Sequence, residues 1–176
     1  MGVAADLGYA HHRPNVVQGV MQGIASSRPG AWVFSRILSP LDRIVHRLSK
    51  GRVTVPEVVA GLPVVFVTTT GRRSGEPRPS PLIAVPIADT LALVGTNFGQ
   101  ASTPAWVLNL EKEPRARASY RGREVEVTAR PATDDERAEV WRAAAGVYPG
   151  YDKYQQRIRG REIRIFVLEG VSEATP

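Results

Sequence analysis

Residues 63–82 read Pro-Val-Val-Phe-Val-Thr-Thr-Thr-Gly-Arg-Arg-Ser-Gly-Glu-Pro-Arg-Pro-Ser-Pro-Leu. The run of Val, Phe and Thr over residues 62–70 predicts a strand that is buried on both faces. The stretch from Gly71 to Arg78 that follows holds two glycines and three arginines, which indicates a turn. A second strand is expected from residue 79, so this stretch predicts a hairpin with a cationic tip.

The same alternation of strand and turn signals continues along the chain. Further strands are expected at residues 79–86, 90–96, 115–120, 123–130 and 163–168. Helices are expected at residues 102–113, 133–147 and 149–159. Thr103 is the predicted N-cap of the first helix, and Thr133 with Glu136 forms a capping box for the second. The second helix is expected to bury an apolar stripe of Trp141, Ala144, Ala145 and Tyr148.

Hairpin spacing favours an antiparallel sheet. Six antiparallel strands with one solvated face usually curl into a small barrel, so the predicted fold class is mainly β with α, a six-stranded barrel with peripheral helices. A dinucleotide-binding α/β fold is excluded, because no G-x-G-x-x-G follows a predicted strand.

The expected organisation is an N-terminal helical extension over residues 1–52 and a barrel domain over residues 53–176. Residues 31–48 show helical periodicity with a basic face, interrupted by Pro40. This helix could lie on a membrane surface or pack on the main domain. The first 20 residues lack a secretory signal pattern, so we expect a cytoplasmic protein, with the inner face of the membrane as one place of contact.

Composition narrows the function classes. The chain has no cysteine and three histidines, which are not placed at metal-ligand spacing, so a metal site or a Ser-His-Asp hydrolase is not expected. The net charge of +6 comes with 20 arginines against 3 lysines. A basic surface suits nucleic acid, an anionic membrane or an anionic small molecule, although a GC-rich genome would also enrich arginine. No nucleic-acid-binding motif is present, so nucleic acid is not an expected partner.

Three segments could carry a site, and each has a structural alternative. The turn at residues 70–78 can point backbone amides and arginines at an anion, or can be a solvated hairpin turn. Residues 95–100, with Trp106 and Asn109 three apart on a helix, could line a planar heterocycle. Alternatively, Trp106 is core and Asn109 caps backbone. The tyrosines at 148, 151 and 154 could wall a pocket, or could be a buried helix face.

Together these motifs resemble the deazaflavin-dependent nitroreductase family of actinobacteria, whose members are split β-barrels, similar to FMN-binding split barrels, that use coenzyme F420. The resemblance covers residues 63–168. It includes the turn already quoted, Gly95-Thr96-Asn97, the string from Pro104 to Pro114, Tyr148-Pro149-Gly150-Tyr151 and Gly160-Arg161-Glu162-Ile163. Phe98 and Ile83 depart from the pattern of many relatives.

The resemblance implies roles for particular residues. Coenzyme binding is assigned to Arg73, Ser74, Gly75, Arg78, Pro81, Leu82, Thr96, Asn97, Phe98, Trp106 and Asn109. Of these, Arg73, Ser74 and Arg78 would hold the phosphate and glutamyl tail. The deazaflavin side would be lined by Pro81, Leu82, Thr96, Asn97, Trp106 and Asn109. Substrate binding is assigned to Tyr148, Tyr151 and Tyr154. No metal is implied, and no residue is assigned as the proton donor.

The implied activity is hydride transfer from reduced F420 to an electron-poor acceptor such as a quinone or nitro compound, by a monomer or homodimer. FMN is the less favoured cofactor, since it has one phosphate and no glutamyl tail to match so many arginines. The alternatives are an FMN-dependent relative, or a barrel that binds F420, lipid or another small ligand without turnover.

Overall fold

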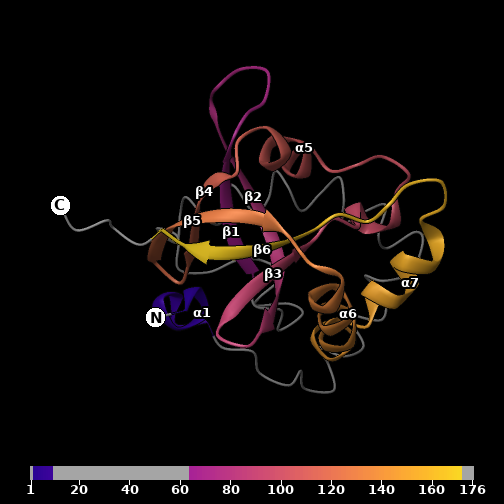
Figure 1. Cartoon of the computed structure of the whole chain (residues 1–176). Coiled ribbons are helices and arrows are strands. Elements are labelled where there is room, and N and C mark those ends of the chain that lie inside the picture. Colours follow the sequence, from indigo (N-terminus) through magenta and orange to yellow (C-terminus); the bar gives the residue numbers. More distant parts are fainter. Residues whose placement is uncertain (1, 10–63, 172–176) are drawn as a thin grey trace.

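In the computed structural model, residues 2–9 and 64–171 are described, and the six strands among them close into an antiparallel barrel. The order around the barrel is β1-β2-β3-β6-β5-β4, and β4 pairs back with β1. Figure 1 shows the barrel with its helices at the periphery. The predicted fold class is therefore confirmed. The strands are β1 (Val64–Thr70), β2 (Pro77–Ile87), β3 (Thr90–Val94), β4 (Arg115–Tyr120), β5 (Arg123–Pro131) and β6 (Ile165–Gly170).

Strand β3 shows how period-two patterning builds two apolar cores. Leu91 and Leu93 are buried inside the barrel, whereas Ala92 and Val94, which point the other way, are buried against the outer helices. Strand β6 divides in the same way. Residues 91–94 and 165–168 are therefore buried on both faces of the sheet, so each stretch is a continuous apolar run in the sequence.

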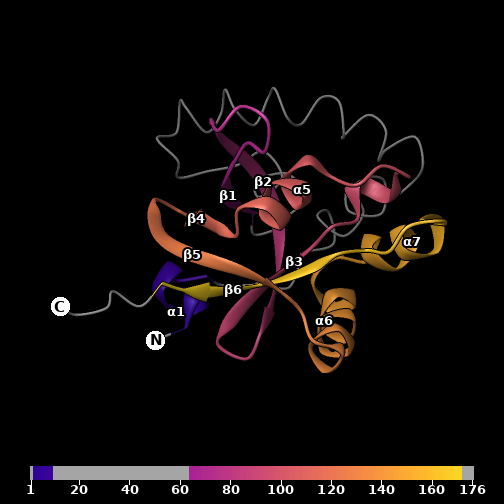
Figure 2. The same cartoon turned by 45° about the horizontal axis from the view of Figure 1, so that its top comes forward.

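The outer core is covered by α6 (Asp134–Val147) and α7 (Gly150–Arg157) (Figure 2). The predicted capping box is present: Thr133 Oγ1 accepts from the Glu136 main-chain N–H, and Glu136 accepts from the Thr133 N–H. The expected apolar stripe was wrong at Ala145, which is exposed. The face of α6 that is buried carries Val140, Ala144 and Val147.

Helix α5 (Ala105–Lys112) begins one residue later than its predicted cap would place it. Thr103 is not the N-cap; Pro104 occupies that position and makes no side-chain capping bond. A 3-10 turn, η1 (Asn97–Gly99), lies between β3 and α5 and was not expected from the sequence. Strand β6 begins at Ile165, two residues after the predicted start.

A short helix, α1 (Val3–Leu7), packs against the barrel from the far N-terminus (Figure 1). Val3 and Leu7 are buried in the inner core, and the Tyr9 hydroxyl donates to the Ala84 main-chain oxygen at 2.7 Å. Residues 2–9 thus contribute to the barrel core, although the sequence assigned them to an extension. The division at residue 52 and the helix at residues 31–48 fall outside the described residues.

Across residues 2–9 and 64–171, no helix is long and apolar enough to cross a membrane.

Candidate functional site

The turn between β1 and β2 is a tight, exposed loop closed by its two glycines. The Gly71 N–H donates to the Glu76 oxygen at 2.8 Å, and the Gly75 N–H donates to the Gly71 oxygen at 2.7 Å. Gly75 has φ of +72°, a conformation that L-residues rarely adopt. Residues 72–79 are all exposed. The turn projects from the barrel (Figure 1), so its side chains are available to a ligand.

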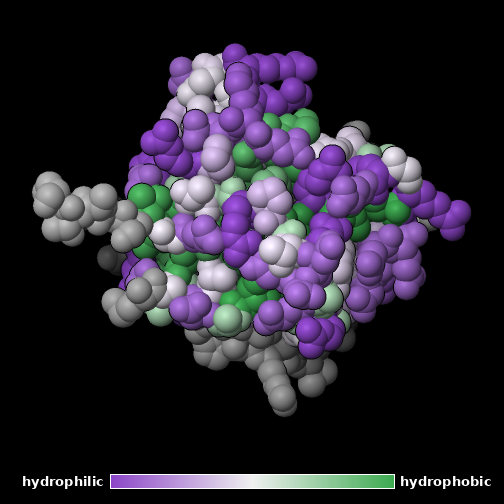
Figure 3. Space-filling view, in the orientation of Figure 1, coloured by the Kyte–Doolittle hydropathy of each residue, from purple (hydrophilic) through white to green (hydrophobic). Residues whose placement is uncertain are grey.

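Four cations gather on and beside this turn: Arg72, Arg73, Arg78 and Lys112. In the part of the chain that the structure describes, none of the four has a carboxylate within salt-bridge distance. Arg78 donates to Ser74 Oγ at 3.2 Å, which orders both side chains. The tip is strongly hydrophilic in Figure 3. An uncompensated cluster of this kind favours a polyanionic ligand.

Helix α5 holds the turn from below through Asn109. The Asn109 Oδ1 accepts from the Arg72 main-chain N–H at 3.0 Å, and its Nδ2 donates to Thr69 Oγ1 at 2.9 Å. Lys112 Nζ donates to the Arg72 main-chain oxygen at 2.7 Å. Asn109 and Thr69 are buried, so the bond between them is shielded from water, whereas the Lys112 bond is exposed. The structure thus gives Asn109 the backbone-capping role that the sequence left open.

The second predicted segment, residues 95–100, has an unusual backbone. Asn97, Phe98 and Gly99 all have positive φ, of 48°, 55° and 78°. Two consecutive non-glycine residues in this region cost free energy, which the surrounding structure must offset. Asn97 Nδ2 donates to the main-chain oxygen and to Oγ of Ser102, both at 3.0 Å. Phe98 is 40% exposed and is therefore accessible to a ligand.

Arg161 holds this segment and was not assigned a role from the sequence. Its guanidinium donates to the main-chain oxygens of Gly95 at 3.0 Å, Thr96 at 3.1 Å and Gln100 at 3.2 Å. Its Nε is buried and has no partner among the described residues. Burial, with a further contribution from Arg164, lowers the pKa of Arg161 below its usual value. Arg161 lay within the family motif, but no local pattern linked it to residues 95–100.

The remaining residues assigned to the deazaflavin side line the barrel. Leu82 and Pro81 on β2 are half-buried, and Leu82 packs against the inner core. Trp106 is 7% exposed and makes an edge contact with Phe166, with ring centroids 6.2 Å apart. Trp106 therefore occupies the core position that was its alternative. A role for these three residues in coenzyme binding remains a prediction.

The three tyrosines form one buried cluster at the junction of α6 and α7. The Tyr148 and Tyr154 hydroxyls are 3.1 Å apart, and the Tyr151 hydroxyl donates to the Ile83 main-chain oxygen at 2.8 Å. Burial is the main reason why the pKa of each phenol is raised above its usual value. The three rings are thus neutral hydrogen-bonding groups within an apolar core. Their contact with a substrate remains a prediction.

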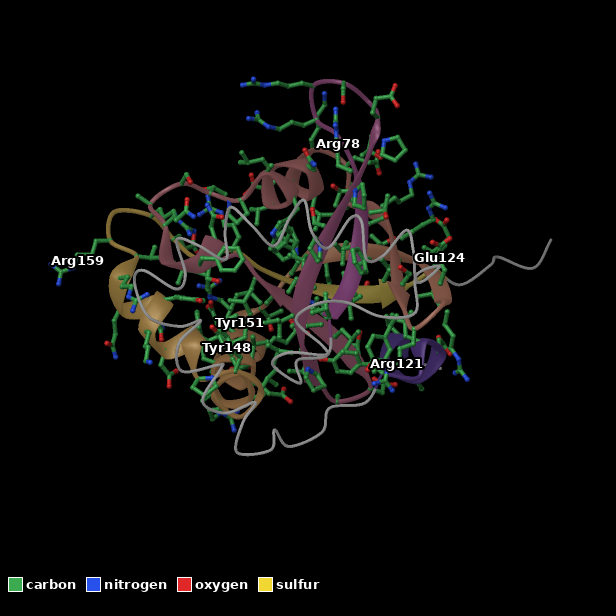
Figure 4. All side chains as sticks on the ribbon, turned by 180° about the vertical axis from the view of Figure 1, so that it is seen from behind. Arg78, Arg121, Glu124, Tyr148, Tyr151 and Arg159 are labelled. Atoms are coloured by element: carbon green, nitrogen blue, oxygen red, sulfur yellow. The ribbon has the colours of Figure 1, made fainter. Side chains whose placement is uncertain are left out.

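The two parts of the candidate site lie apart in space. Figure 4 shows Arg78 at the projecting turn, well away from Tyr148 and Tyr151 beside the helices. Helix α5 spans about 12 Å at 1.5 Å per residue and links the parts. Its C-terminal half contacts the cationic turn through Asn109, and the chain before it binds η1 through Ser102. Phe98 of η1 in turn makes an edge contact with Tyr154, with ring centroids 6.4 Å apart.

Comparison with known proteins extends these observations. An F420H(2)-dependent quinone reductase of Mycobacterium tuberculosis, Rv1261c, is 26% identical over 131 residues, which cover 73% of this chain and 87% of that protein. The structure of an F420-H2 dependent reductase, FDR-A, matches with a TM-score of 0.56 and 32% identity, over 61% of this chain and 94% of the other. A structure described as a domain-swapped dimer matches with a TM-score of 0.58 and 29% identity, over 74% and 98%.

The family model named F420H(2)-dependent quinone reductase matches residues 42–170. This range contains the cationic turn, the η1 segment, Arg161 and the tyrosine cluster. It confirms the resemblance drawn from the motifs and the expectation of an F420-dependent oxidoreductase. The chain belongs to the F420H(2)-dependent quinone reductase family.

Proposed function

We propose that this protein reduces a quinone with coenzyme F420, and that the β1–β2 turn binds the anionic tail of the coenzyme. The observation that carries the proposal is the set of four cations on and beside the turn that have no carboxylate partner in residues 2–9 and 64–171. A phosphate and a chain of carboxylates match this donor set, because guanidinium groups bind both in a bidentate manner. The single phosphate of FMN would leave most of these charges without a partner.

The chain's own residues bind, orient and shield. The turn supplies Arg73, Ser74, Gly75 and Arg78 for the tail, while η1 and β2 supply Thr96, Asn97, Phe98, Pro81 and Leu82 for the deazaflavin side. The bound coenzyme supplies a hydride, and a reduced deazaflavin is a poor one-electron donor. Asn109 fixes the main chain of the turn, so that the cations are held in position before binding.

The tyrosine cluster is proposed as the binding site for the electron acceptor. The cluster joins η1 through the contact between Phe98 and Tyr154, so an acceptor bound there lies next to the segment assigned to the coenzyme. Phenol rings offer an apolar wall with a hydroxyl at its edge, which suits a quinone. An electron-poor nitro compound has the same requirements and is the second proposed acceptor.

We also propose that the protein works at the inner face of the membrane through residues 31–48, which lie outside the described residues. The basic amphipathic pattern of this stretch supports that proposal. Cosedimentation with anionic vesicles checks it, and no binding above that to neutral vesicles would refute it.

The direct test of the activity follows the absorbance of reduced F420 mixed with the protein and a menaquinone analogue. Oxidation of the deazaflavin that requires both protein and quinone is expected. If F420 binds but reduced F420 is not oxidised by any quinone, the barrel is a binding protein without turnover.

A further inference from the structure

Arg161 holds residues 95–100 through hydrogen bonds to main-chain oxygens. Its guanidinium contacts three main-chain oxygens, which belong to residues 95, 96 and 100 and so bracket η1 on both sides. Gly95 is fixed from the same segment, since its N–H donates to the Arg164 main-chain oxygen at 2.9 Å. The stretch from Arg161 to Arg164 therefore holds the loop at several points.

The loop between these points is the most strained part of the described chain. Asn97, Phe98 and Gly99 are successive residues with positive φ, and two of them are not glycine. Such a conformation persists only where its surroundings fix it. Arg161 is one such constraint, beside the two bonds from Asn97 to Ser102. A planar guanidinium can bind several carbonyl oxygens at fixed angles, and a lysine ammonium cannot reproduce this geometry.

The environment of Arg161 also differs from that of an ordinary surface arginine. No carboxylate pairs with it within residues 2–9 and 64–171, so its bonds all go to the loop and its buried Nε has no partner. Its neighbour Arg164 is the opposite case: it pairs with Glu111 at 3.2 Å and Glu162 at 3.3 Å, and is 45% exposed. The two arginines thus form a natural matched pair.

We propose that Arg161 is a positioning residue for coenzyme binding, which holds residues 95–100 in the strained conformation that presents Thr96, Asn97 and Phe98 to F420. The proposal rests on the proposed function, since those three residues are assigned to the coenzyme. It assigns Arg161 no direct contact with coenzyme or acceptor. Loss of the Arg161 hydrogen bonds is expected to lower the affinity for F420, because residues 95–100 must then be ordered when the coenzyme binds.

The test compares Arg161→Lys with Arg164→Lys in the full-length protein. Both changes keep the charge. In free R161K, the rate of amide hydrogen exchange at residues 95–101 is expected to rise about 10- to 100-fold, because a charge-assisted hydrogen bond is lost. In R164K the exchange rate at these residues is expected to stay unchanged. Fluorescence titration is expected to show F420 binding weakened about 10-fold or more in R161K and unchanged in R164K.

A second variant reaches the same loop from α7. A Cβ at Gly99 would lie 3.2 Å from Tyr154 Cδ1 and 3.3 Å from Arg157 Cδ, so Gly99→Ala should shift η1 and also weaken F420 binding. This variant carries the test if R161K does not fold.

The outcomes separate the two proposals. Unchanged F420 affinity in both R161K and G99A would overturn the positioning role. Folded R161K with faster hydrogen exchange over the whole barrel and unchanged F420 affinity would also overturn it. If the parent does not bind F420, the proposed function fails and the role toward the coenzyme fails with it, whereas the exchange comparison still reports whether Arg161 holds the loop.

Discussion

The Asn109 side chain donates from Nδ2 to Thr69 Oγ1 at 2.9 Å, across 40 positions of sequence and within the buried base of the cationic turn. The same amide accepts the Arg72 N–H, so one side chain links α5, the end of β1 and the start of the turn. The family resemblance assigned Asn109 to the coenzyme itself. The geometry adds a second role, in which Asn109 orders the turn that carries the arginines.

Asn109→Leu is expected to weaken F420 binding about 10-fold and to lower the free energy of unfolding by about 1–3 kcal/mol, because buried partners lose their hydrogen bonds. Thr69→Val removes the bond to Asn109 and the 3.4 Å bond from Thr69 Oγ1 to the Arg78 main-chain oxygen, but leaves the bond between Asn109 and the Arg72 N–H, and should have a smaller effect. Fluorescence titration and chemical denaturation of both variants and of the double variant measure the coupling. Strictly additive effects would mean that the Asn109–Thr69 bond does not order the turn.

Arg73→Ala and Arg78→Ala are each expected to weaken F420 binding about 10- to 100-fold without unfolding the barrel, because each removes a charge-assisted contact at an exposed position. Arg142→Ala makes the same charge change on the exposed face of α6 and should have no effect. Titrations at two salt concentrations check the electrostatic origin. Parent-like affinity in both turn variants would reduce the turn to a solvated hairpin.

The tyrosines are expected to respond differently to loss of the hydroxyl. Tyr151→Phe leaves the Ile83 oxygen without its donor and should lower the melting temperature. Tyr148→Phe and Tyr154→Phe should alter turnover with a quinone while F420 affinity stays the same. Steady-state kinetics and thermal melting on all three variants make the comparison. Lower melting temperatures with unchanged kinetics at low temperature would place the whole cluster in the core alone.

Leu7→Ala is expected to destabilise the barrel by about 2–5 kcal/mol, although Leu7 lies far in sequence from the core residues of the strands and outside the family match. The side chain is 1% exposed in the inner core, so its loss leaves a cavity. Ala5→Ser, at an exposed position of the same helix, is the control. Equal melting temperatures for L7A and the parent would show that α1 does not contribute to the barrel's stability.

The Arg130 guanidinium, which donates to both oxygens of Glu136, lowers the pKa of that carboxyl from 4.5 to about 2, and the Thr133 N–H adds to the effect. A carboxyl whose pKa is lower in the folded than in the unfolded protein stabilises the fold at pH values above its unfolded pKa. This stabilisation is lost as the pH falls from 4.5 toward 2. Glu136→Gln should flatten the acid limb of the stability curve, whereas Glu139→Gln on the same helix should not. Denaturation between pH 2 and pH 7 tests this; identical acid limbs for parent and E136Q would contradict it.

Local chemistry explains which features the sequence predicts. Thr133 and Glu136 are three residues apart, so their capping box is visible as a pattern, and apolar runs such as residues 64–67 mark buried strands. Arg161 and Gly95 are 66 positions apart, and Tyr9 and Ala84 are 75 apart. Neither pair leaves a periodic signal, because each depends on how the closed barrel brings distant segments together. The contacts of Arg161 with residues 95–100 and the packing of the N-terminal helix were therefore found only in the structure.

The roles of Trp106 and Asn109 illustrate a second limit. Their spacing of three predicts a shared helical face, and both are buried on α5. Spacing alone does not distinguish a face toward a ligand from a face toward the core. The contacts with Phe166 and with Thr69 resolve that question for the protein without a ligand.

The most direct test of the account is a pair of fluorescence titrations of the full-length protein, one with F420 and one with FMN. The cationic turn predicts F420 binding at micromolar affinity or tighter and much weaker binding of FMN, since FMN lacks the glutamyl tail that the four cations would hold. Tighter binding of FMN than of F420 would contradict the account.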